Sequence, residues 1–405
     1  MVVLLCMALI QAMSSPRSVP IANQSTEVRG VWLTNVGSGV LFAPWGVERA
    51  LNQLARLNFN TVYPVVWNRG HTFYPSATAQ RIIGRSQDPW LNTLRLGGDV
   101  LSTIVKQGNR QGLRVIPWFE YGFMAPAQST LVYRHPEWLT QRQNGTKTLE
   151  LHEHEQTLLT PTQNQLDQQQ LRREIYSRLV GDRVWLNPLH PEVQQFLLDL
   201  ITEVVTQYDI DGIQLDDHFG FPVEFGYDPY TVNLYQQEHN GAKPPNDPLN
   251  AEWMQWRANR LTAFMGRIFE TVKALDPNCI VSLSPNPQAF SYHAYLQDWQ
   301  TWVNRGWVEE LVVQVYRNDL SSFQAVLAQP SIRAAQQRIP VAIAILTGSW
   351  RRPITFRQIR QQVEAVRKAD LNGVSFFYWE TLWSYLTPES PKERRANFQT
   401  LFAKP

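Results

Sequence analysis

Cysteine is scarce in this chain of 405 residues, which contains only Cys6 and Cys279. Cys6 lies in an apolar N-terminal stretch, so we expect the folded part to contain one thiol and no internal disulfide. This excludes the class of small secreted domains that disulfides hold together. A lone cysteine in an apolar run usually packs as a small hydrophobic residue, which is the role expected for Cys279.

An excess of charge of one sign is also absent. The formal net charge is +2 at pH 7, and lysine and arginine form no continuous run. Proteins that bind nucleic acids usually concentrate basic residues in a stripe, so we expect no nucleic acid among the partners. Hydrophobic residues make up 43% of the chain, which is typical of a globular protein with a sizeable core. Nothing in the sequence predicts a stable protein partner.

Long apolar runs are missing, apart from residues 1–13 (MVVLLCMALIQAM). About a dozen apolar residues followed by a polar stretch are typical of a secretory signal peptide and too short for a membrane span. The basic residues that usually precede such a run are absent, so a misplaced start codon or a simple tail are the alternatives. We expect residues 1–25 to be a signal peptide with a polar tail. The protein would then be exported to the periplasm or cell envelope, without a membrane span in the mature chain.

The signatures of several large enzyme classes are missing as well. No Gly-rich dinucleotide fingerprint follows the first apolar run, and the chain has neither a phosphate-binding loop nor a nucleophile elbow around a serine. These absences argue against nucleotide-dependent enzymes and against serine hydrolases of the α/β-hydrolase type. We therefore expect no cofactor.

The chain does contain a repeated alternation of apolar strands and amphipathic helices. In the helix expected after the first strand, Val47, Ala50, Leu51 and Leu54 follow the spacing of one buried helix face. Alternating strands and helices predict a parallel α/β sheet, and eight such units without a dinucleotide fingerprint predict a (β/α)₈ TIM barrel. The eight predicted strands are residues 28–34, 61–67, 113–120, 212–216, 279–284, 311–316, 341–346 and 373–378.

Two connections in this pattern are longer than the others. They are residues 121–210 and 219–250, which follow the third and fourth predicted strands. In a (β/α)₈ barrel, the loops after the strands build the active site. We therefore expect both long loops to be walls of a cleft and residues 26–405 to form a single catalytic barrel.

Aromatic residues are abundant, at 12% of the chain with fifteen tryptophans. Most of these rings are expected in the core, because they bury a large area. Several others come directly after predicted strands, where core packing explains them less well. Flat rings beside polar groups suit the apolar faces of sugars.

Carboxylates end two neighbouring predicted strands. Glu120 closes the third strand among aromatic residues, and Asp216 and Asp217 close the fourth. Cleavage of a glycosidic bond requires two carboxyl groups, one to donate a proton and one to attack or to activate water. An apolar wall raises a carboxyl pKa, which suits Glu120 to the donor role. Strand alternation favours Asp216 over Asp217 as the inward partner. The competing interpretations are a structural glutamate and a turn-forming aspartate pair.

Other polar and aromatic residues at the strand ends are candidates for substrate binding. Aromatic rings would stack on sugars, and amides would hold hydroxyl groups. Glu380 is either a third carboxylate in the cleft or the ion-pair partner of Arg317. The substrate-binding candidates are Trp67, Asn68, Trp118, Tyr121, His218, Asn286, Gln314, Tyr316, Trp379 and Glu380.

Two segments resemble metal-binding patterns. Residues 152–155 (HEHE) lie in a polar stretch and are expected to be solvated. Asp216, Asp217 and His218 can ligate a divalent cation, which would indicate a metal-dependent deacetylase. Such a site needs further histidine ligands, and the sequence offers no convincing pair. We therefore predict no metal site.

Several motifs along the chain are long enough to be specific: residues 29–34 (RGVWLT), 59–62 (FNTV), 185–188 (WLNP), 190–193 (HPEV), 208–217 (YDIDGIQLDD) and 314–316 (QVY). Together they resemble the glycosyl-hydrolase-like family 10, which includes a divisome-localised glycosyl hydrolase of bacterial cell walls. The resemblance implies a (β/α)₈ fold and an exported enzyme that acts on glycan strands. In one branch, the substrate is peptidoglycan stripped of its stem peptides. The chain departs from many members at His218, where they have tyrosine, and at Glu120, near which some have Asn-Pro.

We therefore predict a glycoside hydrolase that acts on a bacterial envelope glycan, with peptidoglycan glycan strands as the first choice. Glu120 would be the general acid, and Asp216 the nucleophile or base, with both carboxyl groups converging on a water-lined groove. Retaining and inverting chemistry both stay open, because they depend on the carboxyl separation. The alternatives are a non-catalytic glycan-binding barrel and a metal-dependent polysaccharide deacetylase.

Overall fold

The computed structural model describes residues 27–149, 182–349, 352–383 and 387–403. The predicted signal peptide and the segment 152–155 lie outside these residues. Within the described ranges, no helix combines the length and the apolar character that crossing a membrane requires.

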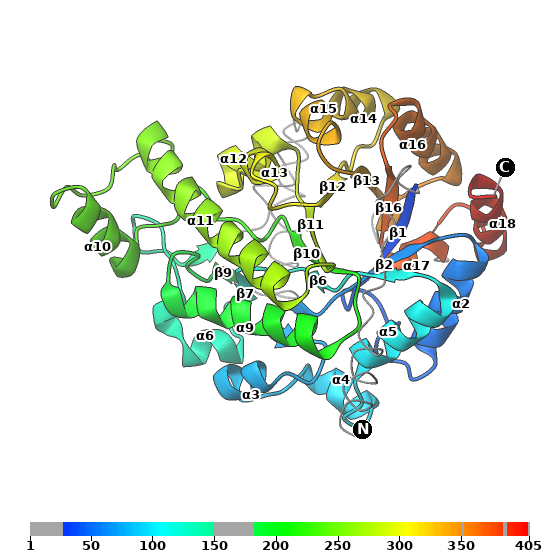
Figure 1. Ribbon diagram of the computed structural model, residues 1–405, viewed down its shortest axis with the longest axis horizontal. Helices are drawn as coiled ribbons and strands as arrows, with labels where there is room; N and C mark the ends of the chain where they lie inside the picture. The colour runs from blue at the N-terminus through cyan, green and yellow to red at the C-terminus, as the bar shows by residue number, and fades with distance from the viewer. Residues whose placement is uncertain (1–26, 150–181, 350–351, 384–386, 404–405) are drawn as a thin grey trace, which may run out of the picture.

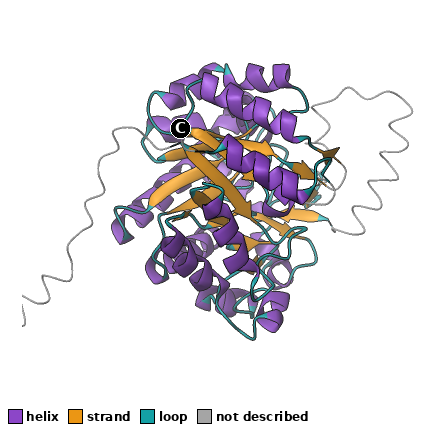
Figure 2. Ribbon diagram, turned by 90° about the vertical axis from the view of Figure 1, so that its right-hand side faces the viewer, coloured by secondary structure: helices purple, strands orange, loops and turns teal. Residues whose placement is uncertain are grey.

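A curled parallel sheet forms the centre of the molecule, and helices surround it (Figures 1 and 2). Its strand order is β5-β2-β1-β16-β13-β12-β11-β10-β6. The two ends of this order, β5 and β6, are separated in the chain only by Ile116 and Pro117. Each of the eight predicted apolar runs contributes to this sheet. The strands are β1 Val28–Leu33, β2 Thr61–Pro64, β5 Arg114–Val115, β6 Trp118–Phe119, β10 Gly212–Asp216, β11 Ile280–Ser284, β12 Glu310–Gln314, β13 Val341–Leu346 and β16 Gly373–Phe377.

Amphipathic helices cover the outside of the sheet. In α2, the four residues Val47, Ala50, Leu51 and Leu54 are fully buried, as their spacing predicts. In α9, Pro191 occupies the first turn, where its missing N–H costs no hydrogen bond. The main outer helices are α2 Gly46–Arg56, α5 Val100–Gln111, α9 Pro191–Gln207, α11 Ala251–Leu275, α13 Trp299–Asn304, α14 Leu320–Leu327, α15 Pro330–Gln336, α16 Phe356–Lys368 and α18 Pro391–Leu401.

The two long connections follow β6 and β10. The first includes a three-stranded antiparallel sheet in the order β7-β9-β8, and the second includes α10 (Pro229–Glu238). A bridge between Arg142 and Phe225 joins the two connections. Further elements lie in the connections that lead from a strand of the sheet to the next outer helix. They are β3 Trp67–Asn68, β4 His71–Thr72, α3 Ala77–Ile83, α4 Pro89–Leu94, β7 Met124–Pro126, α6 Thr130–Arg134, β8 Thr148–Leu149, β9 Arg183–Trp185, α12 Gln288–Tyr295 and α17 Trp379–Trp383.

Polar side chains meet inside the curled sheet. Trp32 Nε1 donates to Gln214 Oε1 at 2.8 Å, although their strands β1 and β10 are not neighbours. Gln214 donates in turn to Ser282 Oγ, and Tyr63 donates to Glu310. Contacts between strands that are not adjacent must pass through the interior, so these side chains mark the inward-facing side of each strand. Side chains two residues further along each strand face the same interior.

Candidate active site

The pairing of β6 with β10 places the two main carboxylates side by side. Trp118 is in register with Gln214, and Phe119 with Leu215. The residues that come next after these register pairs, one on each strand segment, are Glu120 and Asp216. Because Gln214 points into the curled sheet, Asp216 points into it as well, one layer nearer the carboxyl ends of the strands.

Glu120 is held by hydrogen bonds from Thr34, which follows β1, and from Asn68 of β3. Its Oε2 accepts from Thr34 Oγ1 at 3.1 Å and from Asn68 Nδ2 at 2.7 Å. Asn68 also donates to Asn35 Oδ1 at 2.7 Å. The residue is 8% exposed, and burial raises its pKa from 4.5 to about 7, although His218 and the Thr34 hydroxyl act in the opposite direction. A carboxyl with this pKa holds its proton until the pH approaches neutrality.

Asp216 is the more deeply buried of the two aspartates, at 2% exposed. Its Oδ1 accepts from Gln314 Nε2 at 2.7 Å and from the Asp217 backbone N–H at 2.8 Å. Burial and the adjacent Asp217 carboxyl raise the pKa of Asp216 well above its usual range. Gln314 and Asp216 come from strands that are not neighbours, so this bond also crosses the interior.

Asp217 and His218 form the more accessible side of the cluster, with side chains 16% and 21% exposed. Asp217 Oδ2 accepts from Asn286 Nδ2 at 2.8 Å. His218 Nδ1 lies 3.2 Å from Asp217 Oδ1, 3.7 Å from Asp216 Oδ2 and 3.1 Å from the Glu120 carbonyl oxygen. Burial lowers the pKa of His218, but Asp217 and Asp216 outweigh it and raise the pKa to about 9. An imidazolium thus balances the negative charge of the carboxylates.

All three carboxyl groups act on the hydroxyl of Tyr316. Burial raises the pKa of this tyrosine well above its usual range, and Asp216, Asp217 and Glu120 raise it further. Tyr316 therefore lies within the electrostatic reach of all three carboxyl groups. Glu120 and Asp216 are nevertheless more enclosed than a water-lined groove implies, because each is wrapped by its hydrogen-bond donors.

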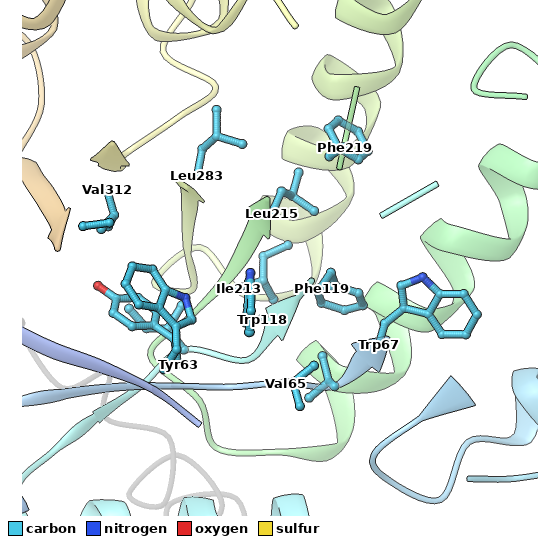
Figure 3. Close-up of a cluster of buried hydrophobic side chains, with 14 of the residues drawn as sticks. Tyr63, Val65, Trp67, Trp118, Phe119, Ile213, Leu215, Phe219, Leu283 and Val312 are labelled. Carbon is cyan, nitrogen blue, oxygen red and sulfur yellow. The ribbon is translucent and has the colours of Figure 1, made fainter. Parts of the chain in front are cut away.

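Trp67 does not take the position expected of a sugar-stacking ring. It is fully buried, its Nε1 donates to the Gly122 carbonyl at 3.0 Å, and its ring centroid lies 5.4 Å from that of Phe196 in α9. Figure 3 shows the ring turned toward the helical layer, away from Tyr63 and Trp118. The expected sugar contact by Trp67 is therefore wrong, because its ring packs between sheet and helix.

Trp118 and Tyr121 are also enclosed. Trp118 is 3% exposed, with ring centroids 6.1 Å from Trp32 and 6.3 Å from Phe377. Tyr121 is 5% exposed, and the guanidinium of Arg183 lies 5.6 Å from its ring centroid. Neither ring has an open face on which a sugar can stack. The expected contacts of Trp118 and Tyr121 with the sugar are therefore wrong. Both rings instead support the chain segment that carries Glu120.

Trp379 and Glu380 begin α17, just after the carboxyl end of β16, and both are partly exposed. Glu380 forms no ion pair with Arg317, so that alternative is wrong for the described structure. Instead, Glu380 Oε1 accepts from the Ser38 hydroxyl and, at 3.1 Å, from the Gly39 backbone N–H. Its Oε2 is buried without a hydrogen-bond partner.

Three residues of the first strand end were missed by the sequence prediction. Thr34 and Asn35 support Glu120 directly or through Asn68, and Ser38 binds Glu380. The rule that polar residues at strand tips carry chemistry applies to Thr34 as well, since it follows β1 directly. A small hydroxyl residue in an otherwise apolar run hides this signal.

Asp216, Asp217 and His218 also form a potential cation site, since one ligand atom of each lies within 4.8 Å of the others. Two carboxylates and one imidazole fit a divalent cation in type. In the described structure, the imidazole Nδ1 of His218 instead contacts carboxylate oxygens directly.

A hollow of about 600 Å³ on the outer surface lies apart from these groups. Its lining contains no carboxylate, so it does not suit acid–base chemistry. It is lined by Arg49, Asn52, Gln53, Arg56, Leu57, Arg395 and Gln399.

The sequence pattern of a known family covers most of the chain. The family described as Glycosyl hydrolase-like 10 matches residues 27–171 and 168–367. The chain belongs to this family. The predicted resemblance is thereby confirmed, and both strand-end carboxylate groups fall inside the matched region.

Two relatives show how far the likeness to known proteins extends. Glycosyl hydrolase DigH of Escherichia coli is 25% identical over 329 residues, which are 72% of this chain and 66% of that protein. Glycosyl hydrolase YngK of Bacillus subtilis is 21% identical over 332 residues, covering 73% of this chain and 55% of that protein. The match therefore spans just under two thirds and just over half of these relatives.

Solved structures support the fold of this family member. The glycoside hydrolase domain of PgaB (BpsB) from Bordetella bronchiseptica superposes with a TM-score of 0.63 at 13% identity, covering 94% of this chain and all of that domain. The catalytic domain of β-amylase from Paenibacillus polymyxa gives 0.59 at 11% identity, covering 95% of this chain and all of that domain. At these identities, the likeness shows a shared fold and no more.

Proposed function

We propose that this protein is an O-glycosyl hydrolase of a bacterial envelope glycan, working by carboxylate acid–base catalysis. The observation that carries the proposal is the meeting of Glu120 with Asp216, Asp217 and His218 at the carboxyl ends of neighbouring strands. Membership of the glycosyl hydrolase-like 10 family supports it. We further infer that β5 and β6 are two parts of one strand, which closes the sheet into a (β/α)₈ barrel.

In this mechanism, Glu120 is the general acid. It gives its proton to the glycosidic oxygen as the bond from that oxygen to the anomeric carbon breaks. The aspartate pair acts on the opposite side of the sugar, where one carboxylate attacks the anomeric carbon or takes a proton from the attacking water. Burial and the adjacent Asp217 carboxyl disfavour the ionised form of Asp216, and the imidazolium of His218 offsets the negative charge of the cluster.

The partly exposed residues around this cluster would hold the sugar. Tyr316 and Trp379 offer rings, and Asn286 and Gln314 offer amides that already orient the aspartates. Asn68 is fully buried and donates to both Glu120 and Asn35, so we infer that it orients the acid instead of making the sugar contact expected from the sequence. Glycan strands of peptidoglycan are the first choice of substrate, as the family resemblance implies.

The decisive experiment incubates the protein with peptidoglycan from which an amidase has removed the stem peptides, and identifies released fragments by mass. Glu120→Gln should reduce turnover by about 10²- to 10⁴-fold while glycan binding persists. Asp216→Asn and Asp217→Asn, tested separately, identify which aspartate acts. Glu137→Gln, at an exposed position with the same change in charge, is the control. Full activity of the Glu120→Gln protein would remove Glu120 from the mechanism.

The two alternatives give different results in the same assay. A glycan-binding barrel without chemistry releases no fragments, and it binds the glycan equally well after Glu120→Gln and after Asp216→Asn. The spacing of Asp216, Asp217 and His218 favours the deacetylase as the second candidate function, and its sign is acetate release that a chelator abolishes.

Export is part of the same proposal. We infer that residues 1–25 direct the chain to the periplasm or cell envelope and that residues 26–405 form the catalytic barrel. Expression of the full chain in a bacterium, followed by fractionation and mass measurement of the purified protein, tests both points. Intact full-length protein confined to the cytoplasm would contradict them.

A further inference from the structure

We propose that Glu380 is a positioning residue that acts on Glu120 through the loop of residues 34–40, here called the β1 loop. This inference rests on the proposed function, because it assigns a role in preparing the proton donor. It concerns a buried carboxyl group that the mechanism does not otherwise need. The argument depends on contacts at the two ends of the β1 loop.

One end of the β1 loop supports Glu120. Thr34 Oγ1 donates to Glu120 Oε2 at 3.1 Å, and the Val36 backbone N–H donates to Thr34 Oγ1 at 3.2 Å. Asn35 Oδ1 accepts from Asn68 Nδ2, the group that donates to the same Glu120 oxygen at 2.7 Å. The loop backbone therefore determines where both donors to Glu120 stand.

The other end of the β1 loop is fixed by Glu380. Its Oε1 accepts from the Ser38 hydroxyl and from the Gly39 N–H, while Ser38 Oγ accepts from the Val40 N–H at 3.4 Å. Between the two ends, Gly37 has φ +62°, and a Cβ there would lie 2.8 Å from the Tyr378 hydroxyl. The loop is thus pressed against the end of the eighth strand, with no room for a side chain at this point.

A short loop held at both ends transmits a change at one end to the other. Without the Glu380 carboxylate, Ser38 and Gly39 lose their acceptor, and the β1 loop can move away from the eighth strand. Thr34 and Asn68 would then donate less well to Glu120. Hydrogen bonds to the ionised form keep a carboxyl pKa down, so weakening them raises it.

The test measures the titration of Glu120 directly, in the full chain without substrate. Glutamate is labelled with ¹³C at its carboxyl carbon, and the Glu120 signal is identified by its loss in Glu120→Gln. Glu380→Ala and Ser38→Ala should each raise the midpoint by about half to one pH unit from the wild-type value. Glu380→Gln keeps an acceptor oxygen for both donors and should restore the wild-type midpoint. The charged and titratable groups that act on Glu120, and that stay in place in these variants, are Arg69, Tyr121, Asp217, His218 and Tyr316.

Glu203 provides a matched control. Its carboxylate accepts from the Ser76 hydroxyl at 2.5 Å and from the Thr78 N–H at 2.8 Å, the same two types of donor, here at the start of α3, which donates no hydrogen bond to Glu120. Glu203→Ala should leave the Glu120 midpoint unchanged. An unchanged midpoint in both Glu380→Ala and Ser38→Ala would overturn the proposal, and so would an equal change in Glu203→Ala. If Glu380→Ala does not fold, Ser38→Ala decides alone.

Activity gives a second readout on the glycan substrate. Glu380→Ala should move the alkaline limb of the kcat profile to higher pH by the same amount as the titration midpoint, because protonated Glu120 then persists further. A shifted midpoint without any hydrolysis by the wild-type protein would leave this inference standing and remove the glycosidase function. Hydrolysis by the wild-type protein, with an unshifted midpoint and pH profile in Glu380→Ala, would support the glycosidase function and remove this inference.

Discussion

At the residue scale, the site is defined by which carboxyl groups carry protons. Burial raises the pKa values of both Glu120 and Asp216, and the charge that remains is balanced by His218. The strand-end rule predicted these three residues correctly as neighbours, because polar residues at those positions have no packing role to fill. Their protonation depends on burial and on hydrogen-bond donors from strands far away in the sequence, which no local pattern contains.

The protonation of Glu120 predicts how stability changes with pH. In the folded protein its pKa is about 7, against 4.5 for an exposed glutamate, so folding favours the protonated form. The wild-type protein should therefore lose stability as the pH rises from about 4.5 through 7, by roughly 3 kcal/mol at about 1.4 kcal/mol per pH unit. Glu120→Gln cannot ionise, so it should gain stability relative to wild type at pH 8 and show little difference at pH 4. Urea unfolding at both pH values measures this. Glu137→Gln, at an exposed glutamate, should show no such dependence, and a pH-independent effect of Glu120→Gln would contradict the assigned burial.

Arg257 provides a second residue-scale prediction. This arginine is fully buried and donates to the carbonyl oxygens of Val223, Phe225, Pro248 and Trp253. Burial lowers its pKa to about 9, although Tyr227 raises it. Lysine cannot reproduce the planar fork, so Arg257→Lys leaves carbonyl groups unpaired and should cost about 2 to 4 kcal/mol of unfolding free energy. Chemical denaturation checks this, with Arg260→Lys on the exposed face of α11 as the control expected to change little.

The same scale explains the failed prediction for Trp67. A tryptophan at a strand end can face either the interior of the sheet or the helical layer, and strand alternation decides which. The chain bends after β2, because β3 pairs with β4 in a separate hairpin, and this turns Trp67 toward α9. Composition and spacing do not contain this bend. Trp118 fails for another reason: it faces the interior, where it packs against Trp32 and Phe377 and keeps no open ring face.

At the element scale, a buried polar cluster joins the two long connections. Asp228 begins α10 and accepts from Thr140 Oγ1 at 2.7 Å, from Asn187 Nδ2 at 2.9 Å and from the Thr231 N–H at 2.9 Å. Thr140 and Asn187 belong to the first long connection, and Asp228 to the second. The sequence predicted that both loops stand on the same face but not that they are bonded together, because the partners are far apart in the chain. Asn187, part of the motif at residues 185–188, is therefore structural.

Removing the central carboxylate of this cluster should loosen both loops together. Asp228→Ala leaves the hydroxyls of Thr140 and Thr231 and one N–H of Asn187 without their acceptor, so it should cost about 2 to 4 kcal/mol. Asp88→Ala removes a comparable cap at the start of α4, where Asp88 accepts only the Leu91 N–H at 2.9 Å, and should cost about 1 kcal/mol. Urea unfolding compares the two variants. Equal losses would show that Asp228 is an ordinary helix cap.

At the scale of the whole molecule, the first and last strands are neighbours. Val28 of β1 is in register with Gly373 of β16, and a Cβ at Gly373 would lie 2.2 Å from the Val28 carbonyl oxygen. The parallel α/β sheet can be predicted from periodicity, because each unit carries its own apolar pattern. How β1 and β16 meet depends on residues far apart in the sequence, and their contact forms only when the chain is folded (Figure 1).

An aromatic cluster centred on Phe398 of α18 links the first and last parts of the described fold. Phe398 is fully buried, with ring centroids 5.6 Å from Phe59, 5.3 Å from Phe376 and 5.5 Å from Trp383. Phe59 precedes β2 and Phe376 belongs to β16, so the Phe398 ring contacts residues from both the first and the last part of the described fold.

Phe398→Ala should therefore destabilise the fold by about 3 to 5 kcal/mol, the usual cost of removing a buried aromatic ring. Phe323→Ala, at an equally buried position in α14, should cost a similar amount, so total stability alone does not separate the two. Hydrogen exchange does. In Phe398→Ala, the amides of β2 and β16 should lose protection first, because the ring that contacts both Phe59, just before β2, and Phe376 of β16 is gone, whereas in Phe323→Ala they should keep it. Equal protection of β2 and β16 in both variants would mean that the pairing of the strands, and not the aromatic cluster, holds this part of the sheet together.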